Sequence, residues 1–192
     1  MAAVRALLVL TVLLGLAYPL AVTGFAQVAT PGRADGALVE RDGTVVGSRL
    51  IGQSFEGRDD YFQSRPSAAG DGYDPLASSA SNLSPANPEF VATVRERIAA
   101  VAERDGVDPA DVAPDAVLAS GSGLDPHISP AYAEQQVARV ARARDLEPAQ
   151  VRRLVEENTA GRSLAFLGEP RVNVLELNLA LDRLAPATGA GR

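Results

Sequence analysis

The sequence predicts one membrane-spanning helix followed by a single soluble α+β domain. An uncharged run covers residues 6–26 near the amino terminus, and no second apolar run of comparable length follows it. The rest of the chain mixes short strand-forming segments with amphipathic helical patterns, which is typical of an α+β domain. A chain of 192 residues has room for one domain of ordinary size and one anchor.

The uncharged run, "ALLVLTVLLGLAYPLAVTGFA", is long enough to cross a bilayer as one helix, because a helix rises about 1.5 Å per residue and the apolar core is about 30 Å thick. A cleaved secretory signal is the alternative, since Gly24-Phe25-Ala26 resembles a cleavage site. The apolar region of such signals is shorter, however, at about 7–15 residues. We therefore predict a cytoplasmic segment 1–5, with Arg5 as its positive flank, and a retained span over 6–27.

The soluble domain is expected over residues 37–185, after a linker over 28–36. A hairpin over 37–55 is predicted first, because Asp42-Gly43 favours a tight turn between strand-forming residues. Residues 57–88 are rich in Ser, Pro, Gly, Asn and Asp, and long segments without regular pattern are usually functional or disordered. The aromatic residues in this segment favour an ordered, irregular surface over disorder.

Four helices with apolar stripes are expected in the soluble domain. They begin at Asn87-Pro88, Ser129-Pro130, Pro148 and Asn173. Gly106 ends the first of them, and a strand remains an alternative for the last. The segment "DAVLAS", 115–120, predicts a short strand, and "LGEPRVNV", 167–174, an extended segment. Residues 186–192 are expected to form a flexible tail.

The composition excludes several kinds of site. The chain has no cysteine and one histidine, so it has no disulfides, and metal sites built from cysteines or several histidines are excluded. All 18 basic residues are arginine, so a phosphate-binding loop that needs lysine is also excluded. The net charge is −6 and no basic stripe runs among aromatic residues, so we expect no nucleic-acid partner. Because the usual metal-binding side chains are missing, we also expect no metal and no cofactor of the chain's own.

The loop "SGSGLDPHISP", Ser120 to Pro130, contains the only histidine. Its serine, aspartate and histidine side chains are those of a hydrolytic triad, but Ser122, Asp125 and His127 are too close in sequence for one, because triads are assembled from separated elements. We therefore assign no catalytic residue, and expect Asp125 to form a turn and His127 to bond the backbone. Prolines stiffen the loop and glycines permit close approach, which predicts a structural or docking role for Gly121, Gly123, Asp125, Pro126 and His127.

The second soluble helix carries three arginines, Arg139, Arg142 and Arg144. We predict that they form a solvated helix face, with a binding patch as the alternative. Gln135 and Gln136 are interpreted as ordinary helix formers.

Several long motifs together resemble the C subunit of the Kdp-type potassium-transporting P-type ATPases. They are "GSRLIGQSF" at 47–55, "YFQSRPSAAGDGYDPLASSASNLSPANP" at 61–88, "ASGSGLDPHISPAYAEQQVARVARAR" at 119–144 and "LGEPRVNVLELNLALD" at 167–182. They occur in the family's order, the resemblance extends over nearly the whole chain, and the single amino-terminal helix also fits.

The resemblance implies a non-catalytic subunit of a complex that imports potassium at the expense of ATP. Its implied partners are a potassium-channel-like subunit, a P-type ATPase subunit and a very small membrane peptide. The family is described as assisting assembly and as a catalytic chaperone that raises the affinity of the ATPase subunit for ATP. A glutamine linked with nucleotide binding falls on Gln136, and the "SGSG" run with Ser120 and Ser122 is likened to the signature loop of ABC-type ATPases.

The implied contact with ATP conflicts with the predicted topology. An amino terminus inside the cell and a single span place the soluble domain outside, whereas ATP is inside. Either the topology is inverted, or the role in nucleotide binding is indirect or wrong. The rival function is an independent, membrane-anchored extracytoplasmic binding module or hydrolase.

Overall fold

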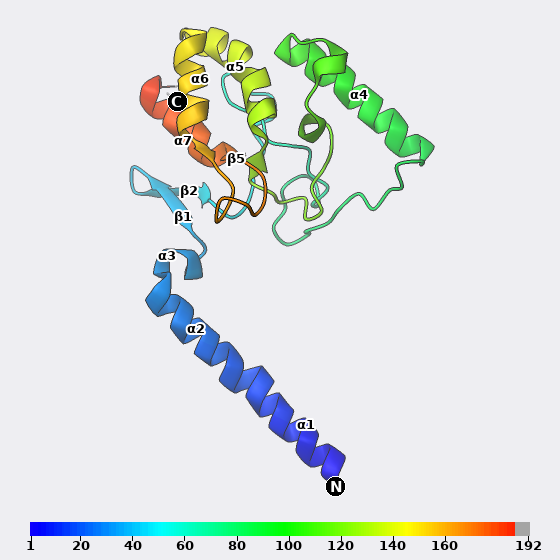
Figure 1. Ribbon diagram of the computed structural model, residues 1–192, viewed down its shortest axis with the longest axis vertical. Helices are drawn as coiled ribbons and strands as arrows, with labels where there is room; N and C mark the ends of the chain where they lie inside the picture. The colour runs from blue at the N-terminus through cyan, green and yellow to red at the C-terminus, as the bar shows by residue number, and fades with distance from the viewer. Residues whose placement is uncertain (187–192) are drawn as a thin grey trace. The chain divides into compact units, whose positions relative to one another are not determined.

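A computed structural model describes residues 1–186 of the chain (Figure 1). The predicted flexible tail, 186–192, lies outside the described residues except for Pro186. The chain divides into two compact units, of which the first is Met1–Ser48 and the second begins at Arg49.

The first unit begins with one apolar helix that is long enough to cross a membrane. It comprises α1 (Ala2–Val12), a π-helical turn η1 (Leu13–Ala17) and α2 (Tyr18–Ala29). Its 28 residues have a mean hydropathy of 2.2 over the most apolar window, and none of that window is buried. The wider turn precedes Pro19, which has no N–H to donate to the preceding turn.

The helix continues past the predicted end of the span, and a short helix, α3 (Pro31–Ala34), occupies part of the predicted linker. A hairpin follows, formed by the antiparallel strands β1 (Leu38–Arg41) and β2 (Thr44–Ser48). Asp42 and Gly43 both have positive φ, at 51° and 75°, as the tight primed turn requires. The predicted hairpin is confirmed, but strand pairing ends at Ser48 rather than near residue 55.

The second unit contains the four predicted helices. They are α4 (Pro88–Asp105), α5 (Pro130–Arg144), α6 (Pro148–Glu157) and α7 (Val174–Leu184). The side chains of Asn87, Ser129 and Asn173 each accept a hydrogen bond from the first turn of the helix that follows. Gly106 ends α4 in the left-handed conformation, at φ 71°. The strand alternative for residues 174–184 is therefore wrong.

A small antiparallel sheet accompanies the helices. Its strands, in the order β3-β5-β4, are β3 (His127–Ile128), β5 (Arg171–Asn173) and β4 (Thr159–Ala160). β5 lies within the segment predicted to be extended, and the mixture of helices with this sheet confirms the α+β class.

The strand predicted over 115–120 is wrong. Two short 3₁₀ turns precede or overlap this region, η2 (Pro109–Asp111) and η3 (Pro114–Ala116), and no strand lies between η3 and β3. The carboxylate of Asp115 accepts hydrogen bonds from the N–H of Ser129 at 2.6 Å and from its hydroxyl at 2.8 Å. This tertiary contact holds the chain in a turn, and a local sequence pattern does not reveal it.

The core of the second unit lies among α5, α6 and α7, which pack side by side (Figure 1). Its fully buried members include Tyr132, Val137, Val140, Leu177 and Leu181. Segment 57–88 has no helix or strand before α4, yet it contributes the fully buried Phe62 and Ala69. The segment is therefore an irregular surface that packs on the core, as predicted.

Candidate functional site

The loop 120–130 lies between η3 and α5 and is anchored through Asp125. One carboxylate oxygen of Asp125 accepts the N–H of His127 at 3.0 Å and lies 3.1 Å from the ring Nδ1 of that histidine. The other oxygen accepts from the guanidinium of Arg65 at 3.2 Å. Burial alone raises the pKa of Asp125, but the hydrogen bonds from His127 and the charge of Arg65 outweigh it, so the pKa is lowered.

This arrangement is not a hydrolytic triad. The hydroxyl of Ser122 accepts the N–H of Leu124 at 3.1 Å and lies 3.4 Å from the hydroxyl of Ser120. No hydrogen bond joins Ser122 to His127 among residues 1–186. The structure therefore brings together Asp125 and His127 but gives no base for a serine nucleophile.

Gly123 lets the loop approach segment 57–88 closely. Its φ is +68°, and a Cβ there would lie 2.7 Å from both the Ala69 nitrogen and the Ser79 oxygen. The hydroxyl of Ser67 donates to the Gly123 carbonyl at 2.6 Å, and the N–H of Ser79 donates to the Ser122 carbonyl at 3.0 Å. The close approach predicted from the glycines is therefore present, and the surface approached belongs to the same chain.

Other members of the loop differ in exposure. Gly121 and Ser122 are exposed, Ser120 and His127 are partly buried, and Pro126 is buried. The Pro126 carbonyl accepts the N–H of Val174 at 3.0 Å, which ties the loop to the first residue of α7. The loop is thus held on both sides by the second unit's own elements.

Gln136, on α5, is fully buried and holds the main chain of segment 57–88. Its side-chain oxygen accepts the N–H of Gln63 at 2.7 Å, and its amide nitrogen donates to the Gln63 carbonyl at 3.2 Å. Asn178, on α7, makes the same paired contact with Phe62, at 2.9 Å in both directions. These two side-chain amides therefore supply the main-chain hydrogen bonds that a neighbouring strand would supply to a regular strand.

The predicted solvated face of arginines on α5 is wrong for two of its three members. Arg139 and Arg144 are buried, whereas Arg142 is exposed. Arg139 donates to the carbonyls of Asp59 and Tyr61 at 2.6 and 2.9 Å, and also to the Gln136 side chain at 2.6 Å. These arginines satisfy backbone groups that an irregular segment cannot satisfy itself.

A buried carboxylate joins α4 to α5. Asp105, whose side chain has no exposed surface, accepts from Arg104 through both oxygens at 2.9 Å and from Arg139 at 2.8 Å. Gln135 adds a further hydrogen bond at 2.8 Å. Burial raises the pKa of Asp105, but the bonds and charge of Arg104 and the bonds from Arg139 and Gln135 prevail, so the pKa is lowered.

Arg144 forms a second buried ion pair, with α7. Its guanidinium donates to Asp182 at 2.9 Å and to the carbonyls of Asp60 and Ala185, each at 2.7 Å. The same guanidinium lies 4.4 Å from the centre of the Tyr61 ring, whose hydroxyl donates to Asp182. Sequence reasoning missed both ion pairs, because carboxylate partners 34 and 38 positions away in sequence give no local signal.

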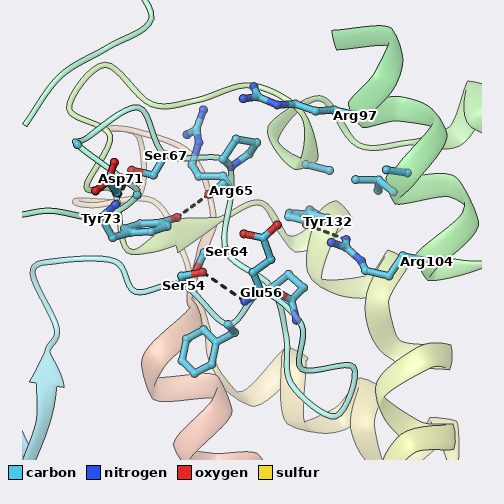
Figure 2. A pocket seen from close by; sticks show the side chains of 18 residues that line it. Ser54, Glu56, Ser64, Arg65, Ser67, Asp71, Tyr73, Arg97, Arg104 and Tyr132 are labelled. Atoms are coloured by element: carbon cyan, nitrogen blue, oxygen red, sulfur yellow. Dashed lines mark hydrogen bonds between the residues drawn. The ribbon is translucent and has the colours of Figure 1, made fainter. Parts of the chain in front are cut away.

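One cleft of about 520 Å³ opens between segment 57–88, α4 and α5 (Figure 2). Arg97 and Arg104 reach it from α4, and Arg65 and Tyr73 from the irregular segment. Each of these arginines donates to a carbonyl or a carboxylate of the chain itself. Burial raises the pKa of Tyr73 to about 12, so its hydroxyl stays protonated and donates to the Arg65 carbonyl at 2.6 Å.

The cleft does not unite the residues that the family resemblance links with nucleotide binding. Gln136, Ser120 and Ser122 are absent from its lining. Within residues 1–186, no group of three histidine, cysteine, aspartate or glutamate side chains is placed to hold a metal ion.

Comparison with known proteins gives consistent matches over nearly the whole chain. A protein named "Potassium-transporting ATPase KdpC subunit" from Kineococcus radiotolerans is 62% identical over 180 residues, which is 94% of this chain and 91% of that protein. Proteins of the same name from Beijerinckia indica and Mycobacterium tuberculosis are 54% and 55% identical, over 94% and 95% of this chain and 91% and 96% of theirs. The family described as "K+-transporting ATPase, c chain" matches residues 1–183. The resemblance found in the sequence is thereby confirmed, and the chain belongs to the family of the c chain of K+-transporting ATPases.

Proposed function

We propose that this chain assists assembly of a potassium-importing ATPase complex and raises the affinity of its ATPase subunit for ATP. The chain is an accessory rather than a catalytic subunit, as the names of its relatives indicate. Its proposed partners are a potassium-channel-like subunit, a P-type ATPase subunit and a very small membrane peptide. The apolar helix Ala2–Ala29 anchors it in the cell membrane beside them.

The effect on ATP is proposed to be indirect, and the burial of Gln136 is the observation that supports this. Both ends of its side-chain amide already bond the main chain of Gln63, and the oxygen also accepts from Arg139. A nucleotide group would have to replace these buried bonds, which leaves a main-chain group unsatisfied at a cost of about 1–3 kcal/mol. Gln136 therefore stabilises the fold of this subunit, and the folded subunit in turn acts on the ATPase subunit.

An indirect role also agrees with the proposed topology. Arg5 flanks the apolar helix on the amino-terminal side, which favours a cytoplasmic amino terminus. The second unit then lies outside the cytoplasm and away from the pool of ATP. The alternative, in which Gln136, Ser120 and Ser122 touch the nucleotide, requires the inverted topology.

A pair of matched variants tests the indirect role. Gln136→Ala and Asn178→Ala each remove one amide that holds segment 57–88, at neighbouring residues Gln63 and Phe62. Each leaves buried main-chain groups unpaired and should destabilise the subunit by about 1–3 kcal/mol. If the effect on ATP passes through the fold, both variants should raise the KM for ATP of the purified complex to a similar extent.

Two outcomes contradict parts of the proposal. A raised KM for Gln136→Ala beside a normal KM for Asn178→Ala would indicate direct contact with the nucleotide. A complex that lacks this chain, yet binds ATP as tightly as the complete complex, would exclude the proposed effect on affinity.

A further inference from the structure

Beside the cleft described above, an ion cluster carries more positive than negative charge. Asp105 accepts from Arg104 at 2.9 Å and from Arg139 at 2.8 Å, so one carboxylate lies between two guanidinium groups. Within residues 1–186, neither arginine forms an ion pair with a second carboxylate. Arg104 also lines the cleft, and its Nη1 has no hydrogen-bond partner among these residues. The cluster therefore offers one unneutralised positive charge to a ligand in the cleft.

Tyr132 adds a hydrogen-bond donor to this wall of the cleft. Only 1% of the residue is exposed, and its hydroxyl accepts from Nη2 of Arg104 at 3.1 Å. The proton of the hydroxyl has no acceptor in the described part of the chain, residues 1–186. Burial raises the pKa of Tyr132, so this proton is present at neutral pH. Because buried donors are almost always paired, the free proton indicates where a ligand would bring an acceptor.

Glu56 supplies the opposite charge. It precedes the irregular segment 57–88, lines the same cleft and points its carboxylate into it (Figure 2). The carboxylates of Asp105 and Asp125 bind arginines, whereas that of Glu56 takes part in no ion pair or hydrogen bond within residues 1–186. The cleft thus presents a cationic group, an anionic group and a buried donor, all of them with unused bonding capacity.

These charges limit the class of ligand. A bare metal ion would be repelled by the excess charge at Arg104, and a polyanion such as a nucleotide by the carboxylates of Glu56 and Asp71, which also lines the cleft. An apolar ligand would bury these charged groups without partners, which is costly. A ligand that carries one charge of each sign avoids all of these costs.

We propose that the cleft binds a small zwitterion, in which a short carbon chain joins an ammonium group to a carboxylate or a phosphate. Arg104 and Tyr132 donate to the anionic group, and Glu56 accepts from the ammonium group. The volume of the cleft, about 520 Å³, lies within the range of small-molecule sites. Such a site is independent of the proposed function, because neither assembly nor the effect on ATP requires it.

Titration calorimetry on the purified full chain, in a non-ionic detergent, tests the site. The zwitterions are glycine and O-phosphoethanolamine. The controls are molecules that carry only one of the two charges, namely acetate, methylamine, phosphate and ethanolamine. We expect at least one zwitterion to bind, and its single-charge counterparts to bind at least about 10-fold more weakly, because each leaves one charged group of the cleft unpaired.

Matched variants connect the binding to these side chains. Tyr132→Phe and Glu56→Gln should each weaken binding of the zwitterion at least about 10-fold. The control for the first is Tyr73→Phe, since the Tyr73 hydroxyl already donates to the Arg65 carbonyl in the same cleft. The control for the second is Glu103→Gln, which changes an exposed carboxylate of α4 outside the cleft lining. Both controls should bind like the wild type. Each titration is run well below the Tm of the variant, so a loss of stability alone does not change the affinity.

A free zwitterion and the head group of a membrane lipid have the same chemistry and are distinguished by the choice of bilayer. The chain is placed in nanodiscs of phosphatidylglycerol, with or without phosphatidylethanolamine, and titrated with O-phosphoethanolamine. If the lipid head group is the natural ligand, phosphatidylethanolamine in the nanodisc should abolish binding of the probe. Equal binding in both nanodiscs identifies a free zwitterion as the ligand.

Three outcomes overturn the site. They are no binding of either zwitterion, equally tight binding of the single-charge molecules, and an affinity that neither Tyr132→Phe nor Glu56→Gln changes. ATP that binds the wild type but not Tyr132→Phe would contradict both the zwitterion and the indirect role proposed above. The first three results leave the proposed function intact, because co-purification with the other subunits tests that function separately.

Discussion

At position 123 the backbone leaves no space for a side chain. Gly123 has φ +68°, and two main-chain atoms of segment 57–88 lie 2.7 Å from where its Cβ would be. Gly121, two residues earlier, is exposed, and no atom lies within 4 Å of its Cβ position. The two glycines of the "SGSG" run therefore serve different purposes, although the sequence does not distinguish them.

We predict that Gly123→Val destabilises the chain and Gly121→Val does not. The left-handed conformation alone costs a side chain about 1–2 kcal/mol, and displacement of Ala69 and Ser79 adds to this. For a chain of this size we expect Tm to fall by at least about 4 °C for Gly123→Val, with Gly121→Val close to wild type. Thermal unfolding of the purified full chain measures both, and equal Tm values would contradict the prediction.

At the scale of elements, buried polar side chains join the helices and the irregular segment, in addition to the apolar core. Asp105 connects α4 to α5, and Gln136 and Asn178 hold the irregular segment on α5 and α7. Fully paired buried groups of this kind favour one arrangement of the elements, since any other leaves charges and main-chain groups unsatisfied.

We predict that the ion-pair cluster makes stability depend on pH. The pKa of Asp105 is lower in the folded chain than in the unfolded chain, so its charge stabilises the fold at neutral pH. This contribution is complete above the unfolded pKa of about 3.9 and is lost as the pH falls below that value towards the folded pKa. Asp105→Asn should therefore destabilise the chain by about 3–5 kcal/mol near neutral pH, and by less in acid.

Unfolding of the wild type and Asp105→Asn across this acidic range measures the effect. The control is Asp111→Asn, which removes an exposed carboxylate from η2. A difference between wild type and Asp105→Asn that stays constant with pH would contradict the assignment.

The helices were predictable because their signals are local. Asn87, Ser129 and Asn173 cap the helices that follow them, and Gly106 ends α4, as their types and positions indicate. The burial of Arg139 and Arg144 was not predictable. Arginines along one side of α5 normally indicate a solvent-exposed face, and the sequence does not show that Asp105 and Asp182 pair with them in the fold. The same reason explains the false strand at 115–120, where the partner of Asp115 is Ser129.

At the scale of the whole molecule, the position of each unit relative to the membrane decides which partner surfaces are accessible. The apolar helix runs through Gln27 to Ala29, so a signal cleaved after Ala26 would be cut within a helix. We predict that the helix is retained. Intact mass measurement of the membrane-extracted chain tests this, and a mature chain beginning at Gln27 would disprove it.

The absence of cysteine makes the topology directly measurable. We predict that Asp111→Cys, at an exposed position of the second unit, reacts with a membrane-impermeant maleimide in intact cells. Ala3→Cys, at the amino-terminal end of the helix, should react only after the cells are opened. The reverse labelling pattern would place the soluble unit inside the cell, next to ATP.

The side-chain amides that hold segment 57–88 also affect the order in which the chain folds. The main chain of Phe62 is hydrogen-bonded to Asn178, 116 positions later, and that of Gln63 to Gln136, 73 positions later. Contacts of such long sequence separation form slowly, because a large loop must close before they stabilise anything. During synthesis from the amino terminus, this segment therefore cannot complete its native hydrogen bonds until α7, near the end of the chain, has been made. A chain that stops before α7 should consequently be recognised by proteases as unfolded over residues that lie more than a hundred positions upstream of the break.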